Sequence, residues 1–454
     1  MILREAPAPP AGFFRRLLAR VIEARPEELP VLGWCWLYIA TVLMSYYIMR
    51  PIRDQAGIAG GVNNLQWLFT GTLIGMLLVN IPFAWLVKNL PRSRFIPITY
   101  RFFALNIVAF ALAFYIATPA TTVWIGRVFF IWASVYNLFV VSVFWQLIVD
   151  LFDSEQGKRL FGFIAAGATI GAIVGSAVTA ALAEHVPAIL LLLGAAVLLE
   201  VAVLSARRLS FLSPVLHRVP ARATSERGRE QRDDPIGGGV IRGLARAINS
   251  SYLLNVSLFM LLFSLTSTFL YFQQAEIVSR TIPSRGAQTA FFASVDLAVN
   301  VLTLGGQLFL SGRIVLGLGV ALALGLLPVL SMIGFGALAL APTITAVVGF
   351  QVLRRAGNFA IARPTREVLF TVVSREDRYK AKSFIDTVVY RLGDQVGAWS
   401  FALLAALGLG SAGVALVAIP ISALWLGNSL WLGRRQERIA AAREAAGEAA
   451  RAPA

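Results

Sequence analysis

The sequence has almost no cysteine or histidine. Among 454 residues there are one cysteine, Cys35, and two histidines, His185 and His217. A single cysteine excludes an internal disulfide framework and a cysteine metal cluster, and two distant histidines exclude a histidine-rich metal site. The chain also lacks a phosphate-binding glycine loop with lysine and serine, and it lacks the spacing of a catalytic triad. These absences argue against an enzyme and predict neither a metal nor a cofactor.

Charged residues are scarce as well. They make up only 14% of the chain, whereas 57% of residues are hydrophobic and the mean hydropathy is +0.73. Apolar stretches of about 20 residues, long enough to cross the hydrocarbon core of a bilayer, recur from end to end. We therefore predict an all-α polytopic membrane protein with the lipid bilayer as a partner.

The apolar stretches form twelve candidate membrane segments. The first is too long and lies too far from the N-terminus to be a cleaved signal peptide. Six segments precede a polar linker and six follow it. They lie near residues 30–53, 64–87, 95–117, 122–150, 160–183 and 187–206, and then near 251–278, 287–311, 314–340, 342–370, 383–408 and 411–433.

Basic residues outnumber acidic ones by 40 to 24, which gives a net charge of +16. In a soluble protein this excess would suggest nucleic-acid binding. Here the basic residues gather in alternate connections, as the positive-inside rule describes, so we predict no nucleic-acid partner and place both termini and the linker in the cytoplasm. The predicted parts are an N-terminal segment 1–29, a six-helix half 30–206, a basic linker 207–250, a second six-helix half 251–433 and a tail 434–454.

The two halves echo each other in sequence. Basic residues open the fifth segment of the first half, at 157–161, and the fifth segment of the second half, at 379–384. Each group follows acidic residues. Two parallel six-helix repeats resemble the major facilitator superfamily, in which solute binds near mid-membrane between the halves. We expect twelve transmembrane helices in this arrangement.

Three glycines repeat every fourth residue in the segment at 160–183. Gly167, Gly171 and Gly175 therefore share one face of the predicted helix. Such a face lets a second helix approach closely, so we predict tight helix packing there.

Arginine lies within and at the edges of the apolar segments. Arg50 and Arg53 fall at the end of the first segment, Arg354 and Arg355 in the tenth, and Arg391 in the eleventh. A charge at the centre of a membrane helix costs roughly 2.5–3.5 kcal/mol even on lenient scales. Such residues face a watery cavity or a partner, so they predict a solute pathway.

Acidic residues in these segments offer partners, but too few of them. Asp54 adjoins Arg53, Asp296 lies about ten residues into the eighth segment, and Asp394 is three residues after Arg391. Asn358 and Arg366 follow Arg355 by three and eleven residues, so the three share a helix face if Pro364 does not break the helix. The first, tenth and eleventh segments still hold more arginines than acids, and guanidinium groups bind phosphate and carboxylate in bidentate geometry. We therefore predict an anionic solute.

At these positions the chain resembles the ATP/ADP carriers of plastids and intracellular bacteria and their free-living bacterial relatives. The most specific block is Pro364-Thr365-Arg366-Glu367, followed by Lys380-Ala381-Lys382 and Ile385-Asp386, with Arg391-Leu392-Gly393 after it. A second block is Arg50-Pro51-Ile52-Arg53-Asp54 in the first segment. A third is Phe144-Trp145, followed by residues 158–162.

The resemblance implies a secondary antiporter that exchanges ATP and ADP in a bacterial inner membrane, which we expect to act as a monomer. The basic group of the family's first helix corresponds to Arg53, and the acid of its eighth helix corresponds to Asp296. Its helix 4 acid has no counterpart, since Asn137 is the nearest polar residue. Its helix 11 lysine is replaced by Asp394.

We assign roles on this basis. Contact with an anionic solute, such as a nucleotide, is predicted for Arg50, Arg53, Arg354, Arg355, Asn358 and Arg391. Coupling or gating is predicted for Asp54, Asp296, Asp394, Lys380 and Lys382. Two alternatives remain open: a proton-coupled transporter or exporter of another organic solute with Asp296 as proton carrier, and a membrane scaffold or sensor in which the charges are structural pairs.

Overall fold

A computed structural model describes residues 28–152, 154–216, 250–374 and 381–449, together with residue 25. The predicted N-terminal segment lies almost entirely outside these residues, and so do most of the linker and Lys380. The described residues are helical with short connections and contain no β-strand.

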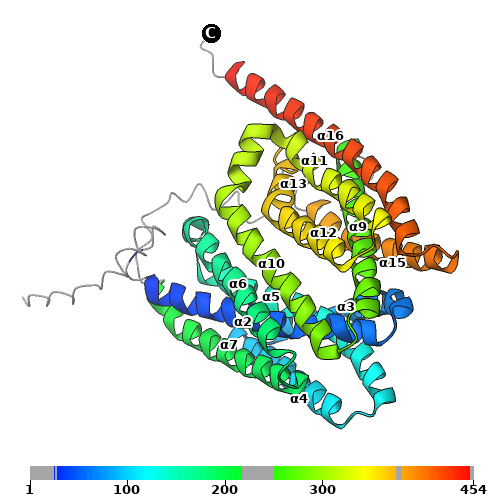
Figure 1. Ribbon diagram of the computed structural model, residues 1–454. Helices are drawn as coiled ribbons and strands as arrows, with labels where there is room; N and C mark the ends of the chain where they lie inside the picture. Colours follow the sequence, from blue (N-terminus) through cyan, green and yellow to red (C-terminus); the bar gives the residue numbers. More distant parts are fainter. Residues whose placement is uncertain (1–24, 26–27, 153, 217–249, 375–380, 450–454) are drawn as a thin grey trace, which may run out of the picture.

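Within the described residues, six long helices make up the N-terminal half, and Figure 1 shows their arrangement. Each of the six segments predicted for this half forms one of them. Five connections of at most five residues join them, and the first contains a short 3-10 turn. The helices are α2 (Leu29–Ala59), α3 (Leu65–Asn89), α4 (Arg92–Ile116), α5 (Pro119–Leu151), α6 (Ser154–Leu182) and α7 (Ala188–Leu216).

The C-terminal half repeats this pattern, with two of its six segments divided by π-helical turns. The undivided helices are α9 (Ser251–Thr281), α10 (Arg285–Phe309), α11 (Ser311–Leu340) and α16 (Ser411–Ala449). The tenth segment consists of α12 (Ile344–Gly357), the π-helix η3 (Asn358–Ala362) and α13 (Arg363–Leu369). The eleventh consists of the π-helix η4 (Ile385–Val389) and α15 (Tyr390–Ala406).

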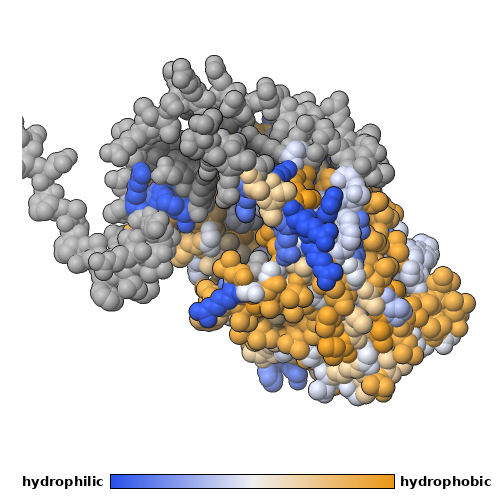
Figure 2. All heavy atoms as spheres, turned by 90° about the horizontal axis from the view of Figure 1, so that it is seen from above, coloured by the Kyte–Doolittle hydropathy of each residue, from blue (hydrophilic) through white to orange (hydrophobic). Residues whose placement is uncertain are grey.

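The outer surface is suited to lipid. Ten of the described helices are long and apolar enough to cross a membrane. Large apolar side chains such as Leu316, Leu340 and Phe211 lie exposed on the outside, and the described part of the face in Figure 2 is largely hydrophobic. A polar exterior would be required in water, so these surfaces confirm the prediction of a polytopic membrane protein.

The glycine face of α6 packs against α2, as its spacing predicts. A Cβ atom on Gly171 would overlap the carbonyl oxygen of Ala40, and one on Gly175 would lie 2.6 Å from the carbonyl oxygen of Met44. Because hydrogen replaces a side chain at these points, the two backbones come into direct contact.

Helix α16 continues past residue 433, where the apolar segment ends. Its Glu437 accepts hydrogen bonds from the backbone N–H groups of Val320 and Ala321, at 2.8 and 3.2 Å. These N–H groups are freed by Gly319, whose φ of +75° breaks the ladder of α11. The carboxylate caps the renewed helix, so a polar extension of α16 is held against α11.

The two halves contact each other mainly toward one end of the molecule. Because successive helices run antiparallel, their ends divide into a linker side, where α7 ends and α9 begins, and a distal side, where α2 ends and α10 begins. On the distal side a Cβ atom on Gly286 of α10 would lie 2.8 Å from the carbonyl oxygen of Ala183, just after α6. From this contact α6 and α10 diverge toward the linker side (Figure 1).

The α2–α6 contact generates a first prediction. Gly171→Ala should force the two backbones apart and destabilise the fold by about 1–3 kcal/mol, the usual cost of overpacking. Gly162→Ala on the same helix is the matched control, because nothing lies within 4 Å of its Cβ position. Thermal unfolding in detergent should show a lower midpoint for Gly171→Ala alone. Equal midpoints for both variants would contradict the packing account.

Candidate functional site

Asp296 is positioned by the apolar face of α10. This helix begins with Ser284, whose hydroxyl accepts a hydrogen bond from the N–H of Ala287. Val295 and Val299 are buried in one cluster with Val352 of α12. Their packing fixes the rotation of α10 and buries Asp296 about 17 Å along the helix from its distal end.

Asp296 is shared by two arginines from opposite halves. Its Oδ1 atom lies 3.0 Å from a guanidinium nitrogen of Arg50 on α2 and 2.7 Å from one of Arg355 on α12. The Asp296 side chain is 3% exposed, whereas those of Arg50 and Arg355 are 18% and 16% exposed. One carboxylate therefore connects the N-terminal half to the C-terminal half, while both arginine side chains remain partly exposed.

A second charged pair lies one turn further along α2. Two nitrogens of Arg53 donate to Oδ1 of Asp54, at 3.0 and 2.6 Å. The same oxygen accepts a hydrogen bond of 3.0 Å from the hydroxyl of Tyr271 on α9, in the other half. Arg53 also lies 5.1 Å from the ring centre of Phe130. Across both sites three guanidinium groups share two carboxylates, which leaves a local positive excess.

Aromatic side chains seal the distal side beyond these charges. Phe69 of α3 packs against Tyr271 and Phe272 of α9, with ring centres 5.7 and 5.3 Å apart. Trp67 of α3 meets Trp399 of α15 edge to face at 4.8 Å. All these contacts join the two halves.

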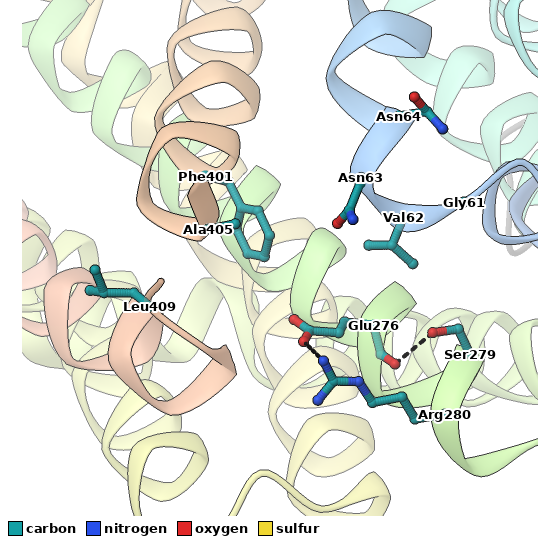
Figure 3. A pocket seen from close by; sticks show the side chains of 10 residues that line it. All are labelled: Gly61, Val62, Asn63, Asn64, Glu276, Ser279, Arg280, Phe401, Ala405 and Leu409. Atoms are coloured by element: carbon teal, nitrogen blue, oxygen red, sulfur yellow. Dashed lines mark hydrogen bonds and ion pairs between the residues drawn. The ribbon is translucent and has the colours of Figure 1, made fainter. Parts of the chain in front are cut away.

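A cavity of about 380 Å³ lies at the outer edge of this seal. Figure 3 shows Phe401 and Ala405 of α15 on one side and Asn63, from the connection after α2, on the other. Glu276 and Arg280 of α9 lie below both in this view and form an ion pair of 2.6 Å. The cavity is separate from the Asp296 cluster and borders both halves.

The helix arrangement and its central charges can now be compared with known proteins. The chain has a major facilitator-like fold. A bacterial homologue of the iron transporter ferroportin in an inward-facing state aligns with a TM-score of 0.60 and 11% identity, over 89% of this chain and 99% of that one. No family model and no curated protein matches the sequence.

Two further solved structures agree on the fold. A bacterial homologue of the human lysosomal transporter Spinster, also inward-facing, has a TM-score of 0.55 and 14% identity, over 92% of this chain and 99% of that one. A POT family transporter in complex with a conjugated peptide has a TM-score of 0.56 and 13% identity, over 90% and 96%. At these identities the likeness concerns the fold alone.

Arg354 lies apart from this cluster. Its guanidinium is enclosed in the C-terminal half and packs near the rings of Phe263 and Trp425. It donates to the hydroxyls of Ser331, Ser267 and Thr266 at 2.8–3.0 Å and to the carbonyl oxygen of Phe263 at 3.2 Å. These bonds tie α9, α11 and α12 together.

The charges of the eleventh segment form a pair within the C-terminal half. Arg391 donates to Asp394 at 3.2 Å, and Asp394 also accepts from Ser264 at 2.5 Å and Thr268 at 3.5 Å on α9. Asn358 is half-buried where η3 begins, directly after α12. The structure therefore brings Arg50, Arg53, Asp54, Asp296 and Arg355 together and holds the Arg391 pair on another helix.

Near the linker side, ion pairs connect the tenth and eleventh segments. Lys382 pairs with Glu367, and Arg366 lies 3.5 Å from Asp386. Arg366 also donates to the sulfur of Met260 on α9, whereas Arg355 contacts Asp296 on α10. The two arginines therefore do not share a face. The π-helix η3 changes the rotation between Arg355 and Arg366, so the α-helical spacing that predicts a shared face does not apply.

The sequence did not show the partners of Asp296. No basic residue lies within four positions of it on its own helix. The structure supplies two arginines from other helices. Tyr271 was not predicted from the sequence, although polar residues are unusually frequent between Thr266 and Gln274 for an apolar helix.

Tyr271 provides a test of the distal seal. Tyr271→Phe removes one hydrogen bond between the halves. Because the acceptor is a carboxylate, the bond contributes about 1.5–3 kcal/mol, and its loss should raise the population of molecules with separated distal ends by about 10- to 150-fold. Spin labels at Ala120→Cys and Ala406→Cys, both exposed on the distal side, would report this as a longer distance component. Cys35 is buried and should not react. An unchanged distance distribution would contradict the assigned role of the bond.

Proposed function

We propose that this protein is a secondary transporter of an anionic solute and that it works by alternating access. The observation that carries the proposal is the placement of Asp296 between Arg50 and Arg355. The carboxylate stands where an anionic group of the solute would bind, between guanidinium groups of opposite halves. A solute that displaces it breaks one connection between the halves and forms another, which couples binding to rocking of the halves.

The residues suit a phosphate-bearing solute in particular. Guanidinium groups present paired N–H donors that match phosphate and carboxylate oxygens, and they keep their charge when partly buried. The resemblance to ATP/ADP carriers supports a nucleotide, since Arg53 and Asp296 correspond to two charged positions of that family. Arg53, partly neutralised by Asp54, extends the positive surface one turn from Arg50.

Alternating access is consistent with the conformation described. The halves meet through α2 with α10, α2 with α9, α3 with α15 and α6 with α10, and the named contacts lie at Asp296 or on its distal side. Under the positive-inside rule the linker side is cytoplasmic, so this conformation would be inward-facing.

Proteoliposome uptake is the direct experiment. Vesicles preloaded with unlabelled ADP and given labelled ATP, ADP or inorganic phosphate outside should accumulate an anion by exchange. Arg355→Gln should lower that uptake at least tenfold, since hydrogen bonds to charged groups contribute about 1.5–3 kcal/mol. Arg355→Lys keeps the positive charge but lacks the paired N–H donors of a guanidinium group. Its uptake should therefore lie between those of Arg355→Gln and the unmodified protein.

A matched control is available on the outer surface. Arg101 and Glu200 form a half-exposed ion pair between α4 and α7, so Arg101→Gln combined with Glu200→Gln should leave uptake unchanged. Absence of anion uptake by the unmodified protein would contradict transport of these solutes. Equal uptake by Arg355→Gln and the unmodified protein would contradict the assigned site.

A further inference from the structure

A polar face runs along α10 from the charge cluster toward the linker side. Asp296, Asn300, Thr303 and Gln307 are spaced by four, three and four residues, so they share one side of the helix. Asp296, Asn300 and Thr303 are 2%, 8% and 7% exposed. Buried polar side chains in such a row are unusual in a membrane helix and predict hydrogen bonding.

Within the described part of the chain, three atoms of this face have no hydrogen-bond partner. They are Oδ2 of Asp296, Nδ2 of Asn300 and Oγ1 of Thr303. Thr289 and Ser294 on the same helix instead donate to the carbonyl oxygens of Arg285 and Ala290. A buried polar group without a partner destabilises a protein, so the two groups beyond Asp296 call for a function.

The two ends of the face fix its direction. Asp296 at one end contacts Arg50 and Arg355. At the other end, the amide of Gln307 donates to the carbonyl oxygen of Phe359 in η3, at 3.3 Å. Asn300 and Thr303 lie between these contacts, and the face from Asp296 to Thr303 is about 10 Å long. It therefore continues directly from the proposed anion site.

We propose that Asn300 and Thr303 form a subsite for the neutral, hydrogen-bonding part of the solute. This inference rests on the proposed function, because the anionic group of the same solute binds at Arg50 and Arg355. The solute class is an organic phosphate that carries hydroxyl or ring-nitrogen groups within about 10 Å of its phosphate. An amide and a hydroxyl both donate and accept, so they suit such groups.

Binding of two matched anions to the purified protein tests the subsite. Pyrophosphate has the charged head alone, whereas ADP has the same diphosphate with a neutral nucleoside attached. The unmodified protein should bind ADP more tightly than pyrophosphate. Asn300→Leu and Thr303→Val should each weaken ADP binding by about 2- to 12-fold, the range for one hydrogen bond, and leave pyrophosphate binding unchanged.

Two further measurements separate this subsite from a structural role. The variants should unfold at the same temperature as the unmodified protein or higher, since each removes an unpartnered buried polar atom. Ser294→Ala is the control and should change neither anion's binding.

The outcomes distinguish the two proposals. The subsite proposal would be overturned if the variants weakened the binding of both anions equally or did not weaken ADP binding. It would also be overturned if the unmodified protein did not prefer ADP to pyrophosphate. None of these results would overturn the anion site. Failure of the unmodified protein to bind either anion would overturn the proposed function and the subsite together.

Discussion

A charged group inside a bilayer must be hydrated or paired, and this constraint governs the centre of the molecule. Asp296 pairs with Arg50 and Arg355 from opposite halves, so neither half can move freely without exposing a charge or finding a substitute. An unpaired buried charge strongly destabilises a protein, whereas replacing one charged partner by another of the same sign costs little free energy. Under the proposed function, the pairing would link binding of the solute to the position of the halves.

The contacts around this centre are individually weak. On the distal side they comprise the Asp54–Tyr271 hydrogen bond, the edge-to-face Trp67–Trp399 pair and the bond between Thr70 and Gln395. Each contributes on the order of 1 kcal/mol. In the proposed transport cycle, a seal of several such contacts would open when solute binding alters the central pair. By contrast, the close backbone packing of α2 on α6 keeps the N-terminal half rigid.

Much of the fold could be predicted from the sequence, because hydrophobic length sets membrane segments almost directly. All twelve predicted segments are helical, and the Gly171 face lies against a helix as its spacing indicates. The end of α16 could not be predicted, since it depends on Glu437 capping a break at Gly319 in another helix.

The site could be predicted only in part. Sequence spacing shows which residues are charged at membrane depth, and it anticipates the local Arg391–Asp394 pair. It cannot show which distant helices meet. The partners of Asp296 come from α2 and α12, and Tyr271 comes from α9. The separate placements of Arg354 and Arg366 depend on packing and on the π-helix η3, which no residue count reveals.

The central claim is that Asp296 occupies the place of the solute's anionic group, and calorimetric titration of the purified protein with pyrophosphate tests it most directly. Asp296→Asn removes the competing carboxylate and leaves both arginines in place. The account predicts about tenfold tighter binding, which corresponds to about 1.4 kcal/mol. Glu200→Gln, at an exposed pair elsewhere, should not change the affinity. Unchanged or weaker binding by Asp296→Asn would contradict the account.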